Sequence, residues 1–180
     1  MFEQASRWTI RLLAALWLST SAIAATDSTD SQAAAYEAKL QTALSKFSAL
    51  AGRWQVLNQM HDPERGWFEA ERAELRFDWA LGGRLLETRG HMQNADFRLS
   101  ISYDAMKSVY RLALIDSASG VLDVYEGDFD DQQTLIVTNP DDFQWRIRQQ
   151  DGGWSLDFYQ STDQGSSWKA LSRNRFTPAS

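Results

Sequence analysis

The 180-residue sequence contains no cysteine, only two histidines and only three prolines. The absence of cysteine excludes disulfides, zinc–thiolate sites, iron–sulfur clusters and a cysteine nucleophile, so packing alone must stabilise the fold. The chain also lacks a basic run, and its formal net charge is −6. This acidity argues against nucleic acid or anionic lipid as a partner, and neither is predicted to bind.

Metal and nucleophile chemistry have little support in the residues that remain. His61 lies in a polar stretch with Asp62 and Glu64, which is more simply a solvated loop than an ion site. No Gly-x-Ser-x-Gly segment is present to form a nucleophile elbow. The sequence therefore predicts no metal ion, no cofactor and no catalytic residue of these kinds.

Residues 1–25 have the pattern of a secretory signal peptide. Arg7 and Arg11 precede an apolar stretch over residues 12–23, which ends in the small-residue pattern Ala22-Ile23-Ala24. A retained membrane anchor is the alternative, but a span needs about 20 apolar residues, and serine and threonine interrupt this run. We therefore expect cleavage near residue 25 and a periplasmic or secreted protein without a membrane span.

Two short segments precede the first expected strand. Residues 26–32 are rich in Ser, Thr and Asp without an apolar pattern, so a flexible leader is expected there. Residues 33–51 have apolar side chains at three- and four-residue spacing, which predicts one amphipathic α-helix ending at Gly52. These apolar residues are Tyr36, Leu40, Ala43, Leu44, Phe47 and Leu50.

From Trp54 onward the apolar period changes to two, and about ten alternating segments follow with short turn sequences between them. Short links join antiparallel neighbours, so residues 52–178 are predicted to form an all-β meander. Closure of the meander removes its edges and gives an antiparallel up-and-down barrel of the lipocalin-like kind. A two-sheet sandwich is the alternative, but it would normally require longer crossovers.

Strand alternation also predicts which side chains face the barrel interior. A two-residue turn at Gly82-Gly83 pairs Trp79 with Leu86 and leaves the neighbouring charged residues on the outer face. A four-residue loop at 104–107 and a five-residue loop at 116–120 extend the interior set to Tyr103, Tyr110, Leu122, Val124 and Glu126. The candidates for a ligand-lining wall are Trp79, Tyr103, Tyr110, Glu126, Trp145 and Phe158.

Glu126 is the one acid that this count places inside the barrel. A carboxylate among apolar side chains must be protonated or hydrogen-bonded, for example to Tyr103, Tyr110 or an arginine. It then either orients a ligand or is a satisfied structural group.

Gly52-Arg53-Trp54 stands after the expected helix and before the first strand, where a lipocalin has its Gly-x-Trp signature. The tryptophan of that signature plugs the closed end of the barrel, and an arginine from the last strand covers its ring through a cation–π contact. The sequence offers Trp54 as the plug and Arg173 or Arg175 as the cover.

Residues 161–168 match the Ser-x-Asp-x-Gly-x-Ser-Trp pattern known as the Asp box in sialidase-type propellers. In such a turn Asp163 bonds backbone N–H groups, Gly165 supplies a positive φ angle and Trp168 packs over the hairpin. Sialidases have several copies on separate blades, and this chain has one. We interpret the segment as a hairpin clamp without a catalytic role.

Several segments together resemble a known family. They are Leu50-Ala51-Gly52-Arg53-Trp54, Trp79-Ala80-Leu81-Gly82-Gly83-Arg84-Leu85-Leu86, Ser102-Tyr103-Asp104, Ile115-Asp116-Ser117 and Glu126-Gly127-Asp128. The chain is similar over about residues 47–177 to the bacterial domain of unknown function 1579. The resemblance implies an exported, lipocalin-like, calycin-type barrel, and the family offers no established catalytic residues to carry over.

Three functions are open at this stage. The barrel can hold a small, mostly apolar molecule in its mouth, because a barrel of this size encloses room for a ligand unless bulky side chains fill it. It can instead be packed solid and act as a structural or interaction protein of the cell envelope. The third possibility, which we favour least, is a calycin-type enzyme with Glu126 as acid or base beside Tyr103 or Tyr110.

Export is the first testable prediction. N-terminal sequencing of the protein released by its native host should begin at Ala25 or Thr26, because the signal-peptide pattern ends there. A soluble protein that retains Met1 would contradict cleavage.

Overall fold

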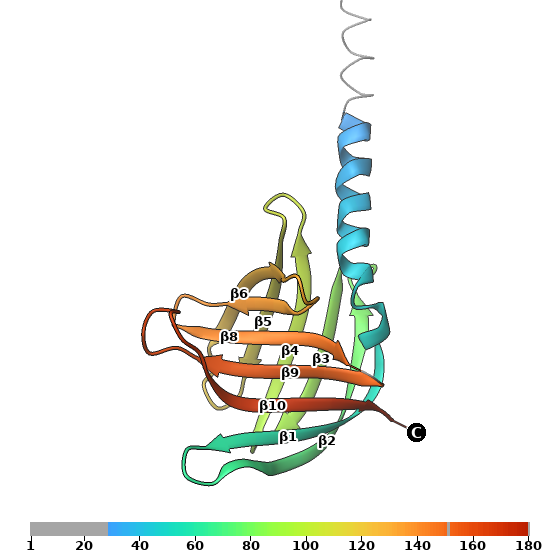
Figure 1. The fold of residues 1–180 in the computed structure, drawn as a ribbon. Helices are drawn as coiled ribbons and strands as arrows, with labels where there is room; N and C mark the ends of the chain where they lie inside the picture. The colour runs from blue at the N-terminus through green and yellow to red at the C-terminus, as the bar shows by residue number, and fades with distance from the viewer. Residues whose placement is uncertain (1–28, 151, 180) are drawn as a thin grey trace, which may run out of the picture. The chain divides into compact units, whose positions relative to one another are not determined.

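The computed structural model describes residues 29–150 and 152–179 and shows an N-terminal helix followed by ten antiparallel strands (Figure 1). The strands are β1 (Gly52–Asp62), β2 (Gly66–Ala80), β3 (Leu85–Met92), β4 (Ala95–Asp104), β5 (Val109–Asp116), β6 (Leu122–Phe129), β7 (Leu135–Thr138), β8 (Phe143–Gln150), β9 (Gly153–Gln160) and β10 (Lys169–Pro178). Each strand pairs with its sequence neighbours, and β1 pairs with β10, so the sheet closes into a barrel. The prediction of an all-β, ten-stranded up-and-down barrel is confirmed.

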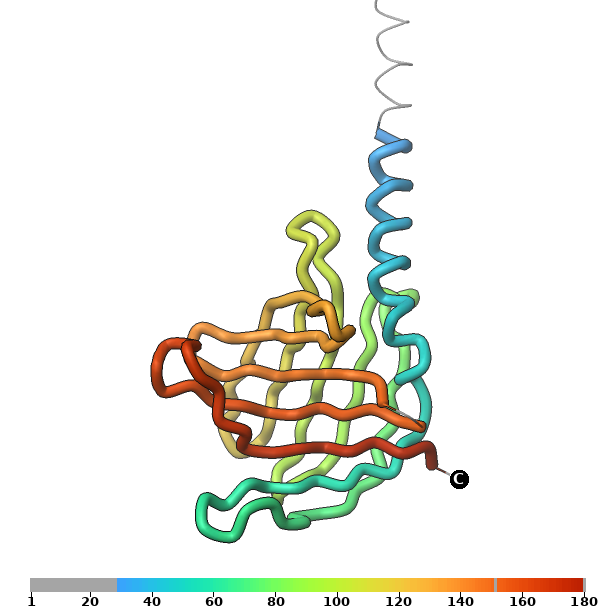
Figure 2. The backbone as a smooth tube through the Cα atoms, viewed as in Figure 1, coloured from blue at the N-terminus to red at the C-terminus, as the bar shows by residue number. Residues whose placement is uncertain are grey.

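Short turns set the register of this meander, as the tube drawing makes easy to follow (Figure 2). The turn containing Gly82 and Gly83 pairs Trp79 with Leu86, as the sequence predicts. Both glycines have positive φ angles, which L residues with side chains rarely adopt. Side chains alternate along a strand, so a fixed register between strands places apolar residues together on the inner face. Charged residues then lie together on the outer face.

The N-terminal helix has different bounds from those predicted. Its described part covers residues 29–45, and a 3₁₀ turn follows at Ser48–Leu50. Residues 29–32, expected in the flexible leader, are therefore helical, and the helix ends six residues before the predicted 51. The signal peptide and residues 26–28 of the leader lie outside the described residues. Among the described residues no helix is long and apolar enough to cross a membrane.

The chain divides into two compact units between Lys39 and Leu40, and residues 40–51 belong to the unit that contains the barrel. Within that unit they contribute Ala43, Phe47 and Leu50 to the main buried cluster. Phe47 is fully buried, and its ring lies 5.8 Å from Tyr110, 5.8 Å from Phe129 and 6.1 Å from Trp154 between centroids. These aromatic rings fill the end of the barrel that contacts residues 40–51.

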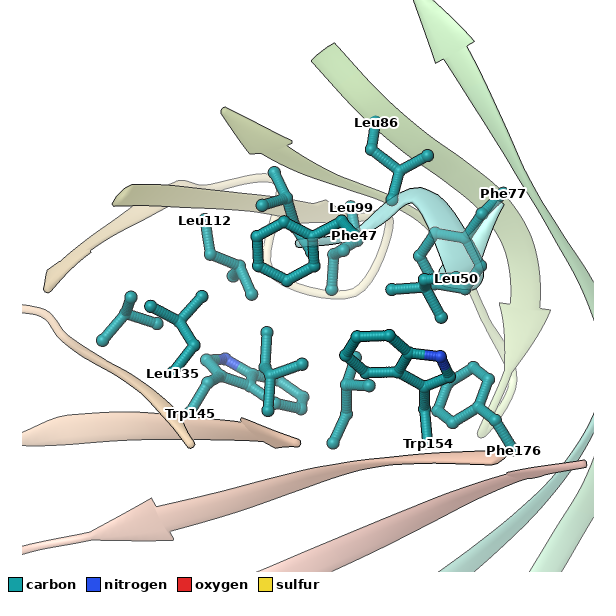
Figure 3. Close-up of a cluster of buried hydrophobic side chains, with 14 of the residues drawn as sticks. Phe47, Leu50, Phe77, Leu86, Leu99, Leu112, Leu135, Trp145, Trp154 and Phe176 are labelled. Atoms are coloured by element: carbon teal, nitrogen blue, oxygen red, sulfur yellow. The ribbon is translucent and has the colours of Figure 1, made fainter. Parts of the chain in front are cut away.

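The buried cluster in Figure 3 shows how this end joins the barrel core. Phe47 and Leu50, from the segment after the helix, lie among apolar side chains that project inward from the strands. The labelled strand residues are Phe77, Leu86, Leu99, Leu112, Leu135, Trp145, Trp154 and Phe176. Phe47 and Leu50 therefore plug one end of the barrel, and we call it the closed end.

Trp54 lies in the same buried cluster, with 7% of its surface exposed. Its indole Nε1 donates a hydrogen bond to the carbonyl oxygen of Leu50 at 2.7 Å, which ties β1 to the preceding 3₁₀ turn. The carbonyl groups at a helix end have no partner within the helix, so this bond satisfies one of them. The bond and the burial together give Trp54 a structural role at the closed end.

The predicted arginine cover over Trp54 is wrong. The guanidinium of Arg173 lies over the ring of Trp67, 3.9 Å from its centroid, and Arg175 forms an ion pair with Asp157. The physical reason is strand alternation, because Phe176 is buried inside the barrel and its neighbour Arg175 must face the other way.

The structural role of Trp54 leads to a prediction about stability. Trp54→Ala should reduce the free energy of unfolding by about 3–5 kcal/mol in urea denaturation, as large aromatic deletions from cores do. Trp79→Ala is the matched control, since Trp79 is 37% exposed, and it should cost clearly less than Trp54→Ala. Equal losses for the two variants would show that Trp54 has no special part in closing the barrel.

Candidate functional site

A cavity of about 340 Å³ lies inside the barrel at the end opposite the closed end. Its mouth is formed where β3 turns into β4 and where β5 leads into β6, and we call this the open end. The lining residues are Asn58, Leu75, Phe77, Thr88, Met92, Gln93, Ala95, Phe97, Leu99, Leu114, Asp116, Ala118, Trp145, Leu156, Phe158, Ser172, Asn174 and Phe176. They come from β1–β5 and β8–β10 and from two of the turns at this end, so the cavity lies inside the barrel.

The walls of the cavity are mostly apolar and aromatic. Trp145 and Phe158 lie with ring centroids 4.7 Å apart, and Phe143 stacks on Phe158 at 5.4 Å. Such ring pairs hold each other in fixed orientations, so this wall is preformed. Apolar walls with a few polar groups are typical of small-molecule sites, whose volumes start at about 300 Å³.

Three amide side chains form a connected polar cluster in the cavity, which we call the amide relay. The Nε2 of Gln93 donates to Oδ1 of Asn58 at 2.9 Å, and Nδ2 of Asn58 donates to Oδ1 of Asn174 at 2.8 Å. The Nδ2 of Asn174 then donates to the backbone carbonyl of Leu156 at 3.1 Å. Asn58 and Asn174 are directly paired in the register of β1 with β10, so closure of the barrel brings them together.

Thr88 adds a polar group that has no protein partner. Its side chain faces the interior beside Phe77, and the residue is 2% exposed. The Oγ1 atom makes no hydrogen bond with any described residue. A buried hydroxyl without a partner costs free energy, so a bound molecule that bonds to it would remove that cost.

Two of the six predicted ligand-lining residues, Trp145 and Phe158, line the cavity. Tyr103 and Tyr110 lie elsewhere, at the closed end, with their rings 4.8 Å apart and the Tyr110 hydroxyl donating to the Ala43 carbonyl. Trp79 does not line the cavity, and 37% of its surface is exposed. Alternation gives the correct face for the two tyrosines, but it does not give their depth along the barrel.

The prediction that Glu126 lies inside the barrel is wrong. Its carboxylate pairs with the guanidinium of Arg111 at 2.7 Å, and the side chain is 44% exposed. The cause is one extra loop residue: Ile115 pairs with Leu122, so residues 116–121 form the connection rather than 116–120.

The extra residue reverses the faces of β6. Leu122 is 60% exposed and Val124 is 41% exposed, and both were expected inside the barrel. Tyr125 takes the interior place and is 2% exposed. Burial raises the pKa of Tyr125 and of Tyr110 to about 12, so neither phenol exchanges protons readily near neutral pH. The enzyme hypothesis therefore loses Glu126 as an interior acid, and Tyr110, one of its two proposed partners, keeps its proton near neutral pH.

The amide relay and Thr88 were missed as site residues. A signal for Asn58 was present, because Trp54, Val56 and Asn58 alternate along one strand and the first of these was expected inside. Asn174 stands in the same way between Ser172 and Phe176. The expected cover placed Arg173 or Arg175 on the inner face of β10. That assignment put Ser172, Asn174 and Phe176 on the outer face, so Asn174 was not considered as an interior residue.

The polar stretch around His61 forms a turn. The Oδ1 atom of Asp62 accepts hydrogen bonds from the backbone N–H groups of Glu64 and Arg65, each at 2.8 Å. Within residues 29–150 and 152–179, no group of three or more acidic or histidine side chains is arranged to hold a metal ion.

The Asp-box segment between β9 and β10 forms a hydrogen-bonded clamp. Asp163 accepts bonds from the backbone N–H and the hydroxyl of Ser167, at 2.8 and 2.6 Å, and from the hydroxyl of Ser161 at 2.7 Å. Gly165 has a φ angle of 84° at the tip of the turn. These hydrogen bonds lower the pKa of Asp163 from its ordinary 3.8 to about 2, the bond from the Ser167 hydroxyl being the main cause.

The depressed pKa of Asp163 gives a pH-dependent prediction. The ionised carboxylate stabilises the fold at every pH above about 4, and this contribution disappears as the pH falls from about 4 to about 2. The melting temperature of the native protein should therefore exceed that of Asp163→Asn at pH 5, and the difference should shrink toward pH 2. A difference that stays constant over this range would contradict the assignment.

Comparisons with known proteins do not assign the chain to a family. No model of a known protein family matches the sequence, and a search of curated proteins finds no relative. The similarity to the domain of unknown function 1579 therefore rests on the sequence segments alone and stays a prediction. The function has to be argued from the cavity itself.

Proposed function

We propose that this protein binds one small, mostly apolar molecule in the open end of its barrel. The observation that carries the proposal is the cavity of about 340 Å³, with aromatic and aliphatic walls and a hydrogen-bonded amide cluster. Burial of an apolar ligand in such a space contributes roughly 25 cal/mol for each Å² removed from water.

The arrangement of the interior supports binding over a purely structural role. The closed end is filled by Phe47, Leu50 and Trp54, whereas the open end holds a cavity and a hydroxyl group without a protein partner. Protein interiors are normally packed as densely as organic crystals, with few voids larger than a water molecule. A solid interaction module has no need for a cavity of this size, and a binding protein does.

The proposal includes export and a lipocalin-like family origin. Both rest on the sequence, through the signal-peptide pattern of residues 1–25 and the segments that resemble the domain of unknown function 1579. A periplasmic or secreted binding protein would encounter its ligand outside the cytoplasm. No catalytic step is part of the proposal, because Glu126 faces solvent.

Binding can be tested with N-phenyl-1-naphthylamine, a neutral apolar dye whose fluorescence rises in apolar surroundings. The protein should bind one dye per chain with a Kd of about 1–10 μM, a free energy of about −7 to −8 kcal/mol. Ala95→Trp should weaken binding at least tenfold, because Ala95 lines the mouth and the larger side chain would block it. A tenfold increase in Kd corresponds to a loss of about 1.4 kcal/mol of binding free energy. Ala113→Trp is the matched control, because Ala113 lies on the same sheet but on the outer face beside Val124.

The control separates blocking of the cavity from a general effect of added tryptophan. Ala113→Trp should bind the dye as the native protein does. Native mass spectrometry of protein purified from its own host should add a bound mass that Ala95→Trp lacks. Absence of saturable dye binding together with absence of any co-purified mass would overturn the proposal and favour an interaction protein.

A further inference from the structure

We infer that the cavity selects uncharged amphiphiles, molecules with an apolar body and one hydroxyl or carbonyl oxygen, and discriminates against carboxylates. The inference deepens the proposed binding function and rests on it. It combines the chemistry of the groups inside the cavity with the charges around its mouth.

The cavity offers no cation to an acidic ligand. Among the described residues that line it there is no lysine, arginine or histidine, and the one charged lining residue is Asp116. A carboxylate that moves from water into an apolar site loses most of its hydration energy. A cation or several hydrogen-bond donors in the site must compensate for that loss. An uncharged hydroxyl or carbonyl group has a much smaller hydration energy to lose.

Neutral polar groups in the cavity match an uncharged oxygen. Each amide NH₂ has two protons, and the relay bonds of Asn58 and Asn174 use one proton each, so each keeps a donor. The Thr88 hydroxyl can both donate and accept, and it has no partner. A ligand hydroxyl or carbonyl oxygen can therefore accept from a relay amide, or it can form a hydrogen bond with Thr88.

Asp116 at the mouth remains ionised at neutral pH. Its Oδ1 atom accepts hydrogen bonds from the backbone N–H groups of Ser119 and Ala118 at 2.7 and 2.9 Å. These bonds, with the Ser119 bond as the main cause, lower the pKa of the Asp116 carboxyl. The fixed negative charge at the entrance repels an anionic head group.

The loops around the open end strengthen this field. Between them, the five connections at this end contain one base, Arg65, and the acids Glu64, Asp141, Asp142 and Asp163. Among the strand-end residues here, Asp62 and Asp116 add two negative charges and Lys169 adds one positive charge, so the acids remain in excess. Summed charges around a cleft set the local concentration of charged ligands, so anions are depleted here and cations are enriched.

A competition assay against N-phenyl-1-naphthylamine tests the inference with three ligands of one chain length: 1-decanol, decyltrimethylammonium and decanoate, at pH 8. The Kd should increase in that order. Decanol should bind at least about tenfold more tightly than decanoate. The two charged ligands both lose hydration, so the preference for the cation over the anion reports the acidic mouth. Added salt should reduce this preference, because it screens exposed charges.

Thr88→Val tests recognition of the ligand oxygen. Valine keeps the shape of threonine and removes the hydroxyl, so decanol should bind about three- to tenfold more weakly. Decyltrimethylammonium has no hydrogen-bonding group, and its affinity should not change. The melting temperature should not fall, because the Thr88 hydroxyl has no protein partner to lose.

Asp116→Asn tests the charge at the mouth. Asparagine retains a side-chain oxygen for the Ala118 and Ser119 N–H groups, so the turn is kept. Decanoate should bind more tightly to this variant, with decanol unchanged.

The outcomes separate this inference from the proposed function. Failure of both the dye and all three decyl ligands to bind would overturn the binding function itself. Binding of the dye with equal affinities for decanol and decanoate would overturn only the selection for uncharged molecules. Unchanged decanol affinity in Thr88→Val would overturn the assigned role of the hydroxyl.

Discussion

Pairing of the first strand with the last is the constraint on which the barrel and its cavity depend. The register of β1 with β10 sets Val56 opposite Phe176 and Asn58 opposite Asn174, all four on the inner face. A slip of one residue would reverse the inner and outer faces of one strand. It would turn Arg175 or Leu57 toward the barrel interior, opposite a residue with which it is not paired in this register. The hydrogen-bonded asparagine pair is thus a product of closure, and it marks the seam of the barrel from within.

The segment that precedes β1 plugs one end of the closed barrel. Residues 47–54 fill the closed end, where Phe47 packs against Tyr110, Phe129 and Trp154. The aromatic content that the sequence shows therefore has two uses. Some rings stabilise the closed end, and others, such as Trp145 and Phe158, form the wall of the cavity. The division follows depth along the barrel axis rather than residue type.

The sequence predicts the fold well because turns and alternation are local signals. The Gly82-Gly83 turn gives the register of β2 with β3, and the inward places of Trp145 and Phe158 follow from the same period of two. Interior assignment fails where a loop length is ambiguous. The connection between the paired residues Ile115 and Leu122 is one residue longer than the predicted loop of 116–120. This difference moves Glu126 from the interior to an exposed ion pair with Arg111. Leu122 and Val124 are apolar, so their side chains agreed with the incorrect interior assignment. In the structure both are exposed on the outer face.

The polar groups of the cavity occupy inward positions of the alternating pattern, but that pattern alone does not identify a polar residue as part of a site. Their presence inside has a cost that the structure offsets in part. Three amides satisfy one another in a relay that ends on the Leu156 carbonyl, whereas the Thr88 hydroxyl is left without a partner. Valine would fit the same place and remove the cost, so stability alone does not explain threonine there. A ligand whose oxygen bonds to Thr88 does explain it, because the hydroxyl then gains the hydrogen-bond partner that the described residues do not supply.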